Sequence, residues 1–298
     1  MKFKLKHLIT YTLAVVLSST LITGCGSTSN KKVVIGSKNF TENEIVAEIY
    51  ALALEDAGFE VERNFDISSS VVHEAITNKE IDLYPEYTGT GLLSVLKESA
   101  TTGQSEQEVY DIVKKGYKEK YNITWLNYSP ANDGQALVIR TAVAKKYNIY
   151  TISDLQQHAS ELRFVSQGEF DEREDGLPAL EAVYGEFNWK SSKVYDNSLK
   201  YEILSKDEGD VCPAGPTEGN LVQKKYTLLK DDQGVWPPYN IAPIVRNKVL
   251  KKYPEIKKVL NKISPKITTK AITKLNAKVD VDKEEYTDVA KEFYDSIK

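Results

Sequence analysis

Cysteine and histidine are scarce in this sequence. Its 298 residues include two cysteines and three histidines. Because Cys25 lies in the N-terminal region, Cys212 is the only thiol in the body of the chain, and no structural disulfide is expected there. His73 and His158 stand alone, without an HxxxH or CxxC pattern. We therefore predict no metal site and no cofactor, and we expect stability to come from packed apolar cores.

The motifs of common enzymes are also missing. The sequence has neither a Gly-x-Ser-x-Gly nucleophile motif nor a phosphate-binding glycine loop. Cys212 has no identifiable base, and a small residue packed in a loop explains it better than a nucleophile does. We predict no catalytic residues and no enzymatic activity.

Clusters of basic residues are absent as well. The formal net charge is −4 at pH 7, and no run of lysine and arginine suggests a nucleic-acid partner. No stretch after the N-terminal region is long and apolar enough to cross a bilayer. The composition therefore favours a mildly acidic globular protein.

The N-terminus has the features of a secretory signal peptide. Three lysines within the first six residues precede a moderately apolar stretch, Leu8–Leu21, which is too short and too polar for a membrane span. The segment ends in Leu21-Ile22-Thr23-Gly24-Cys25, which resembles the lipobox of bacterial lipoproteins, in which the cysteine is lipidated. We predict a signal peptide over residues 1–24, a lipidated Cys25 and a flexible tether over 25–31. The protein is therefore expected outside the cytoplasm, lipid-anchored to the bacterial cell membrane.

The stretch Ile81–Gly91 has the pattern of a strand, a loop and the start of a helix. Pro85 is predicted to end the strand, because proline cannot donate to a central ladder, and Gly89 allows close backbone approach. Open α/β sheets bind ligands where strand ends face helix N-termini, since exposed N–H groups and the helix dipole favour an anion. Tyr87 and Thr90 add an aromatic face and a hydroxyl, so we predict a ligand site here.

The rest of the chain alternates short strands with helices, which is typical of an α/β protein. A capping box, Thr41-x-x-Glu44, is predicted to start the first helix, and Ser105-x-x-Glu108 and Ser153 are predicted to start later ones. Residues 168–176 are predicted to form a solvated charged loop, and residues 249–298 to be nearly all helix. Further strands are predicted over 33–35, 59–65, 123–128, 136–140, 162–166, 227–229 and 244–245, and further helices over 71–78, 142–147 and 177–184.

This order of elements indicates two lobes. The chain is predicted to cross to a second lobe near Asn132 and to return near Tyr239. Residues 32–132 together with 240–298 would form lobe 1, and residues 133–239 would form lobe 2. A ligand cleft is expected between the lobes.

Four short motifs follow the lipobox in a specific order. They are Ile35-Gly36-Ser37-Lys38-Asn39-Phe40-Thr41-Glu42, Asp82-Leu83-Tyr84-Pro85-Glu86-Tyr87-Thr88-Gly89-Thr90, Asp154-Leu155 and Pro237-Pro238-Tyr239-Asn240. Together they resemble the substrate-binding proteins of osmoprotectant ABC importers, the glycine betaine, choline and carnitine family. The resemblance implies an α/β type II periplasmic-binding-protein fold, with two lobes, two crossovers and a ligand cleft. It also implies a monomer that delivers its ligand to a membrane permease served by a separate ATPase.

The resemblance further implies a box of tyrosines that holds a quaternary ammonium by cation–π attraction. Tyr87 and Tyr239 match two walls of this box, whereas Gln135 and Gly215 occupy the positions of the other two. The Gln135 amide adds a donor and an acceptor, and Gly215 leaves room for a longer molecule. Candidates for a replacement wall are Phe40, Phe170 and Trp236.

Donors for the anionic end of a betaine are expected just before two predicted helices. Lys38, Asn39, Thr88 and Thr90 lie there, where backbone N–H groups favour an anion. The resemblance assigns Lys38 and Thr90 to the ligand carboxylate. For Thr217, helix capping is the alternative to ligand contact. The full set of expected ligand-binding residues is Lys38, Asn39, Tyr87, Thr88, Thr90, Asn132, Gln135, Phe170, Gly215, Thr217 and Tyr239.

The expected function is that of an importer receptor for a small quaternary ammonium or betaine ligand such as glycine betaine, choline or carnitine. A larger trimethylammonium zwitterion such as ergothioneine is a competing ligand, because two aromatic walls are missing. A sensory protein on the same fold is the alternative function. Permease and ATPase genes beside this one would favour the importer.

Overall fold

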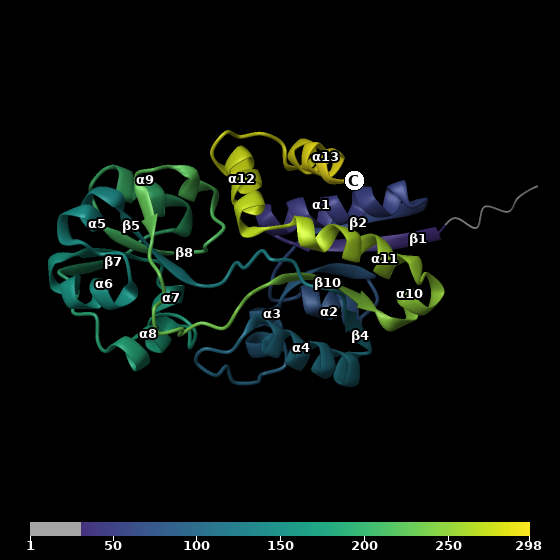
Figure 1. Cartoon of the computed structure of the whole chain (residues 1–298), viewed down its shortest axis with the longest axis horizontal. Coiled ribbons are helices and arrows are strands. Elements are labelled where there is room, and N and C mark those ends of the chain that lie inside the picture. Colours follow the sequence, from purple (N-terminus) through teal and green to yellow (C-terminus); the bar gives the residue numbers. More distant parts are fainter. Residues whose placement is uncertain (1–30) are drawn as a thin grey trace, which may run out of the picture. The chain divides into compact units, whose positions relative to one another are not determined.

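The computed structural model describes residues 31–298, and the predicted signal peptide and lipidation site at Cys25 lie outside the described residues. No helix within residues 31–298 is long and apolar enough to span a membrane. The described chain forms two mixed β-sheets with helices on their faces, which confirms the predicted α/β fold with two lobes (Figure 1).

The sheet of lobe 1 has five strands in the order β2-β1-β3-β10-β4. These strands are β1 (Lys31–Lys38), β2 (Phe59–Ile67), β3 (Leu83–Tyr87), β4 (Ile123–Trp125) and β10 (Ile241–Arg246). Strand β3 is central, and all five of its residues are buried. It runs parallel to β1 and antiparallel to β10, so a strand from late in the sequence completes the first lobe.

Side-chain alternation along β3 separates the two cores of lobe 1. Leu83 and Tyr87 face the core formed with α1, α11, α12 and α13, whereas Tyr84 faces the core formed with α2 and α4. The helices of this lobe are α1 (Thr41–Asp56), α2 (Val72–Thr77), α3 (Thr88–Thr90), a π-helical turn η1 (Gly91–Val95), α4 (Glu106–Tyr121), α10 (Asn247–Lys252), α11 (Glu255–Ile263), a short η5 (Ser264–Lys266), α12 (Thr269–Asp280) and α13 (Tyr286–Ile297).

The sheet of lobe 2 has the order β7-β6-β8-β5-β9. Its strands are β5 (Ala136–Arg140), β6 (Arg163–Ser166), β7 (Ser191–Val194), β8 (Val211–Ala214) and β9 (Tyr226–Leu228). Alternation along β5 directs Leu137 and Ile139 into one core and Val138 into the other. The helices are α5 (Thr141–Tyr147), α6 (Ile152–His158), η2 (Ala159–Glu161), α7 (Glu169–Glu172), α8 (Leu177–Tyr184), η3 (Asn197–Leu199), α9 (Lys200–Ser205) and η4 (Gly219–Val222).

The prediction that Pro85 ends its strand is wrong. Pro85 lies within β3, directly opposite Pro243 of β10. The carbonyl oxygen of Pro85 accepts from Asn43 Nδ2 at 2.9 Å, and that of Pro243 accepts from the Leu126 N–H at 2.9 Å, so both residues direct their backbone polar groups away from each other. In such a pair neither residue needs an N–H, and two prolines fit into the middle of the sheet.

Two predicted helix caps are also wrong. The Thr41 hydroxyl does not cap α1; it donates to Asp280 Oδ1 of α12 at 2.7 Å. Helix α6 is capped by Thr151 and Asp154, not by Ser153, whose hydroxyl donates to Asp232. Long-range partners outcompete the local bond in both cases. The capping box that starts α4 at Ser105 is confirmed.

The sequence patterns missed several elements of lobe 2. Strand β7 is half-buried or exposed along its length, so it lacks an apolar signal. Strand β8 contains Pro213, and the short α9 has no clear period. Helix α7 begins in the stretch 168–176 that was predicted to be a loop.

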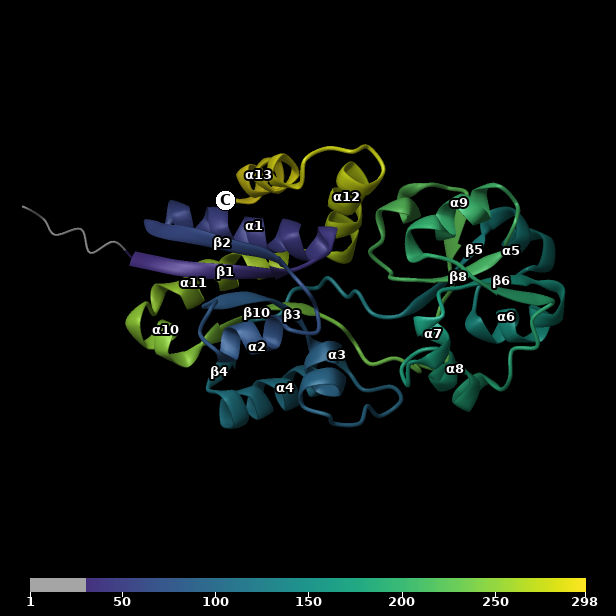
Figure 2. The ribbon, with the colours of Figure 1, turned by 180° about the vertical axis from the view of Figure 1, so that it is seen from behind.

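The two crossovers run side by side and are hydrogen-bonded to each other (Figure 2). The Asp133 N–H donates to the Tyr239 carbonyl at 3.1 Å, and the Tyr239 N–H donates to Asn132 Oδ1 at 2.8 Å. Asn132 also bridges to Asn240 across the pair. Because the sheets separate at this point, we propose the lobe boundaries 32–132 with 240–298, and 133–239.

A third contact joins the lobes at Gly219 of η4. A Cβ atom at this glycine would lie 2.6 Å from the backbone nitrogen of Ala277 and 2.7 Å from its Cα. Ala277 lies on α12, and on this helix the side-chain amide of Asn276 also donates to the Thr217 carbonyl at 2.9 Å. Backbone of lobe 2 thus packs directly on α12 of lobe 1.

The change Gly219→Ala should therefore destabilise the protein. Overpacking against a helix backbone costs about 1 to 3 kcal/mol, because neither segment can move aside as a flexible side chain would. Urea unfolding of the two proteins measures the difference. The control is Val222→Ala in the same 3-10 helix, since Val222 is 48% exposed and its loss should change stability by no more than about 0.5 kcal/mol. Equal effects of the two changes would contradict the close contact.

Candidate ligand-binding site

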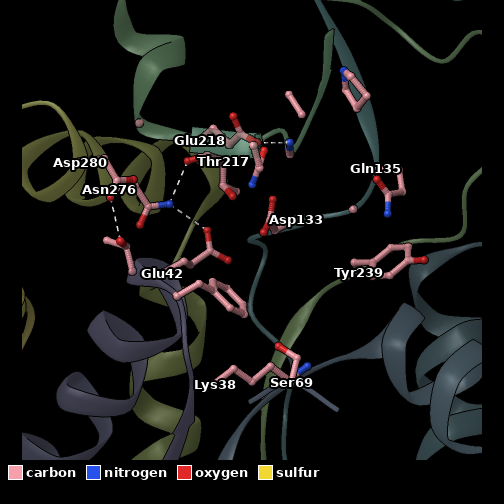
Figure 3. A pocket seen from close by; sticks show the side chains of 18 of the residues that line it. Lys38, Glu42, Ser69, Asp133, Gln135, Thr217, Glu218, Tyr239, Asn276 and Asp280 are labelled. Carbon is pink, nitrogen blue, oxygen red and sulfur yellow. Dashed lines mark hydrogen bonds between the residues drawn. The ribbon is translucent and has the colours of Figure 1, made fainter. Parts of the chain in front are cut away.

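A cavity of about 930 Å³ lies between residues of the two lobes (Figure 3). Residues of lobe 1, of the crossovers and of lobe 2 contribute to its walls. Of the residues expected from the sequence, those that line it are Lys38, Tyr87, Thr90, Gln135, Gly215, Thr217 and Tyr239. The structure therefore brings together side chains that are up to two hundred positions apart in the chain.

Tyr87 forms an aromatic wall at the end of β3. Its side chain is almost fully buried, and its hydroxyl donates to Glu42 Oε1 at 3.0 Å. The Phe40 ring lies nearby, with 6.0 Å between the ring centroids and a tilt of 33°. Phe40 also lines the pocket, so this candidate for a missing wall lies where a ligand can reach it.

Tyr239 forms a second aromatic wall, and glycines make room for its ring. A Cβ atom at Gly89 would lie 2.6 Å from the ring, and one at Gly134 would lie 2.8 Å from it. The ring can rest on the backbone only because both positions lack a side chain. The Tyr239 hydroxyl donates to Asp175 Oδ2 at 3.1 Å. Gly89 of α3 therefore makes room for Tyr239 of the returning crossover.

Lys38 has a different partner from the one expected. Its ammonium lies 2.5 Å from Glu86 Oε1, and both side chains are almost fully buried. Glu86 also accepts from the Tyr84 hydroxyl at 2.8 Å and from the Tyr87 N–H at 2.7 Å. Because removing one partner of a buried ion pair is costly, the Lys38 charge is held by Glu86 and is not free for a ligand carboxylate. The ammonium lies 5.0 Å from the centroid of the Tyr87 ring and so supports that wall.

Four expected site residues do not line the pocket. Asn39 is exposed outside it. Thr88 is buried, and its hydroxyl donates to the Pro238 carbonyl and accepts from the Asn240 N–H, so it ties β3 to the returning crossover. Asn132 ties the first crossover to the returning one, because its Oδ1 accepts from the Tyr239 N–H. Phe170 packs in the core of lobe 2 against Phe164.

Trp236 is also occupied elsewhere. It packs on the core of lobe 2, and its indole N–H donates to the Asp175 carbonyl at 2.7 Å. Of the three candidates for a replacement wall, only Phe40 lines the pocket.

Glu42 and Asp133 are the principal residues that the sequence reasoning missed. Glu42 comes from the first turn of α1 and is 3% exposed. Asp133 comes from the first crossover, and its Oδ1 is buried without a hydrogen-bond partner in the described chain. Burial raises the pKa of Glu42 to about 8, and repulsion by Asp133 adds to the increase. Burial likewise raises the pKa of Asp133 to about 6. Glu42 is the last residue of the motif Ile35–Glu42, and in the sequence an acidic residue in the first turn of a helix is explained by the helix dipole alone.

Gly215 makes room for Asp133. A Cβ atom at Gly215 would lie 2.4 Å from Asp133 Oδ1, so any side chain there would collide with the carboxylate. Nearby, the Gly215 N–H donates to Glu218 Oε1 at 2.8 Å, and Lys200 forms an ion pair with the same oxygen at 2.6 Å. The departure from the family tyrosine at Gly215 is thus linked to an acidic group in the pocket.

The two lobes, the paired crossovers and the pocket between them define a type II periplasmic binding protein. The chain belongs to the family described as the substrate-binding domain of ABC-type glycine betaine transport systems, which it matches over residues 31–296. A solved structure of a glycine betaine/carnitine/choline ABC transporter superimposes with a TM-score of 0.81 at 26% identity, covering 90% of this chain and 98% of that one.

Two curated relatives are also similar in sequence. The carnitine transport binding protein OpuCC of Listeria monocytogenes (serotype 1/2a, strain 10403S) is 33% identical over 286 residues, covering 95% of this chain and 92% of that protein. The ergothioneine transport permease/ergothioneine binding protein EgtU of Helicobacter pylori (strain G27) is 31% identical over 269 residues, covering 90% of this chain. This chain spans about half of that relative, 48% of its length. The family is one of transport binding proteins and not a class of enzymes.

The raised pKa values of Glu42 and Asp133 predict how stability depends on pH. In the unfolded chain the carboxyl groups of aspartate and glutamate have pKa values of about 4. Because the pKa values of Glu42 and Asp133 are higher in the folded protein, the folded state binds more protons than the unfolded state between about pH 5 and about pH 8. The free energy of unfolding of the ligand-free protein should therefore fall as the pH rises through this range. Thermal unfolding at a series of pH values measures the slope, which should be flatter in Glu42→Gln because the amide stays neutral.

A matched control is Glu119→Gln on α4, which removes an exposed carboxylate far from the pocket lining. This variant should keep the slope of the unmodified protein. A Glu42→Gln slope equal to that of the control would show that Glu42 is ionised throughout.

Proposed function

We propose that this chain is the extracytoplasmic solute receptor of an ABC importer and binds a trimethylammonium solute in the cavity between its lobes. The observation that carries the proposal is the combination of aromatic rings and acidic groups in one cavity. Phe40, Tyr87 and Tyr239 line it together with Glu42 and Asp133. This combination suits a cation that donates no hydrogen bond.

The physical argument is one of charge and hydrogen bonding. A quaternary ammonium cannot satisfy a hydrogen-bond acceptor, but aromatic faces attract it with about 0.5 to 2 kcal/mol per contact. Glu42 and Asp133 form no ion pair within the described chain, so a ligand cation would find an excess of negative charge here. The carboxylate of a betaine would lie toward a neutral donor, for which Thr90 is a candidate because it lines the pocket.

A second candidate ligand is a longer zwitterion that also carries N–H groups, as ergothioneine does. The specific observation is the buried Asp133 Oδ1, which accepts no hydrogen bond from the described residues. An unsatisfied buried acceptor is costly, and a trimethylammonium group cannot satisfy it, whereas a ring N–H can. The names of the relatives, a carnitine-binding and an ergothioneine-binding protein, support both candidates.

Lipid anchoring at Cys25 belongs to the same proposal. An importer receptor works outside the cytoplasm, next to its permease, and a lipidated cysteine followed by a polar tether would hold it there. The change Cys25→Ser should release the protein from the membrane fraction of expressing cells into the medium or periplasm. Immunoblots of the fractions measure this, and a variant that stays with the membrane would exclude lipidation at this residue.

The ligand class is tested by calorimetry with glycine betaine, choline, carnitine, proline betaine and ergothioneine. We expect binding of trimethylammonium compounds and none of glycine. The change Tyr87→Ala should weaken that binding by about 2- to 30-fold, the equivalent of one lost cation–π face. Tighter binding of ergothioneine than of carnitine would favour the N–H-bearing ligand.

Two controls accompany this measurement. Tyr87→Phe keeps the aromatic face and loses only the bond to Glu42, so it should bind more tightly than Tyr87→Ala. Tyr150→Ala removes a tyrosine that is 48% exposed and away from the pocket lining, and it should bind like the unmodified protein. Failure of all five compounds to bind would exclude the proposed function.

A further inference from the structure

Two acidic groups of the pocket, Glu42 and Asp133, form no ion pair with any residue of the described chain 31–298. We propose that Glu42 and Asp133 share a proton in the ligand-free protein and that the cationic group of the ligand displaces this proton when it binds. The pocket would then act as a proton-exchanging cation subsite. The displacement step rests on the proposed function, because it requires a positively charged ligand.

The surroundings of Glu42 supply only neutral hydrogen-bond donors. The Tyr87 hydroxyl donates to Oε1 at 3.0 Å, and the Asn276 amide donates to Oε2 at 3.0 Å. The same amide donates to the Thr217 carbonyl at 2.9 Å, which fixes its orientation. Glu42 is thus held in place, at 3% exposure, and forms no ion pair within residues 31–298.

The surroundings of Asp133 are equally short of positive charge. The Asp133 N–H donates to the Tyr239 carbonyl, and this bond fixes the backbone of Asp133 at the pocket wall. Its Oδ1 is buried and accepts no hydrogen bond within the described residues. Both carboxyl groups line the same cavity, and Asp133 repels the negative charge of Glu42, so binding of a proton by the pair lowers the energy.

Of the four cations that line the pocket, three have carboxylate partners, and the fourth is Lys283. The three come from β1, from the segment after α7 and from α9, and the pairs are Lys38 with Glu86 at 2.5 Å, Arg173 with Asp175 at 2.7 Å and Lys200 with Glu218 at 2.6 Å. Beyond α12, Lys283 donates to the Asp280 carbonyl, while the Asp280 carboxylate accepts from Thr41. The Glu42 and Asp133 charges are therefore in excess.

The electrostatics agree with this geometry. Burial is the main reason that the pKa values of both groups are raised, and the neighbouring carboxylate raises that of Glu42 further. Glu218 raises the pKa of Asp133, Lys200 lowers it by less, and hydrogen bonds from Thr217 lower it as well. A ligand cation beside the two carboxylates would favour their charged forms, and the proton would pass to the solvent.

Proton release is measured by titration calorimetry near pH 7 in buffers that differ in ionisation enthalpy. The probes are carnitine and ergothioneine, neither of which changes its own charge near neutral pH. We expect the observed heat to depend on the buffer with a slope approaching one released proton, and the affinity to rise with pH by up to about tenfold per unit. Both effects should vanish in Glu42→Gln and persist in Glu119→Gln. A buffer-independent heat for the unmodified protein, with binding intact, would overturn the proposal.

The ligand-free protein gives an independent test. Carboxyl ¹³C resonances of labelled aspartate and glutamate should include one or two groups that titrate between about pH 6 and about pH 8, well above the ordinary range. These resonances should be altered in Glu42→Gln and in Asp133→Asn, and their absence from the unmodified protein would overturn the shared proton. This measurement needs no ligand, so it stands even if no trimethylammonium compound binds and the proposed function fails.

Discussion

The hydrogen bonding between the two crossovers is the constraint on which the binding site depends. The Asn132 amide and the Asp133 N–H hold the backbone of Tyr239, and Thr88 holds that of Asn240. This pairing brings Asp133 of one crossover and Tyr239 of the other to the wall of the same cavity. Gly89 and Gly134 then allow the Tyr239 ring to rest directly on the backbone. The pairing thus holds together the residues of the two lobes that line the cavity.

Charge in the pocket is distributed unevenly, and this asymmetry connects structure with function. Lys38, Arg173 and Lys200 of the pocket walls are matched by carboxylates of the protein. Glu42 and Asp133 receive bonds only from neutral groups of the described chain, and Asp133 Oδ1 receives none. A receptor built in this way offers aromatic faces and negative charge to a cation. It leaves the anionic end of a zwitterion to polar groups at the rim, such as Thr90.

Much of the fold follows from local patterns in the sequence. Strand and helix periods indicated the α/β architecture, and the Ser105 capping box was recognised because both of its partners lie within one turn. The local sequence patterns gave wrong predictions where a residue distant in the sequence determines the structure. Pro85 is tolerated in a central strand because Pro243 faces it, and the Thr41 hydroxyl bonds Asp280 of α12 instead of its own helix. Half-exposed β7 carries no apolar signal at all.

The sequence by itself determined the class of protein, because the motif order and the tyrosines at positions 87 and 239 are properties of short segments. Tertiary structure alone decided which side chains meet in the pocket. Lys38 is neutralised by Glu86, forty-eight positions away, and Gly215 is small because Asp133 needs the space. Such pairings depend on how strands and crossovers pack, and no local pattern encodes them. The physical reason is that charge balance and close packing are set by neighbours in space, whereas sequence periodicity reports only neighbours along the chain.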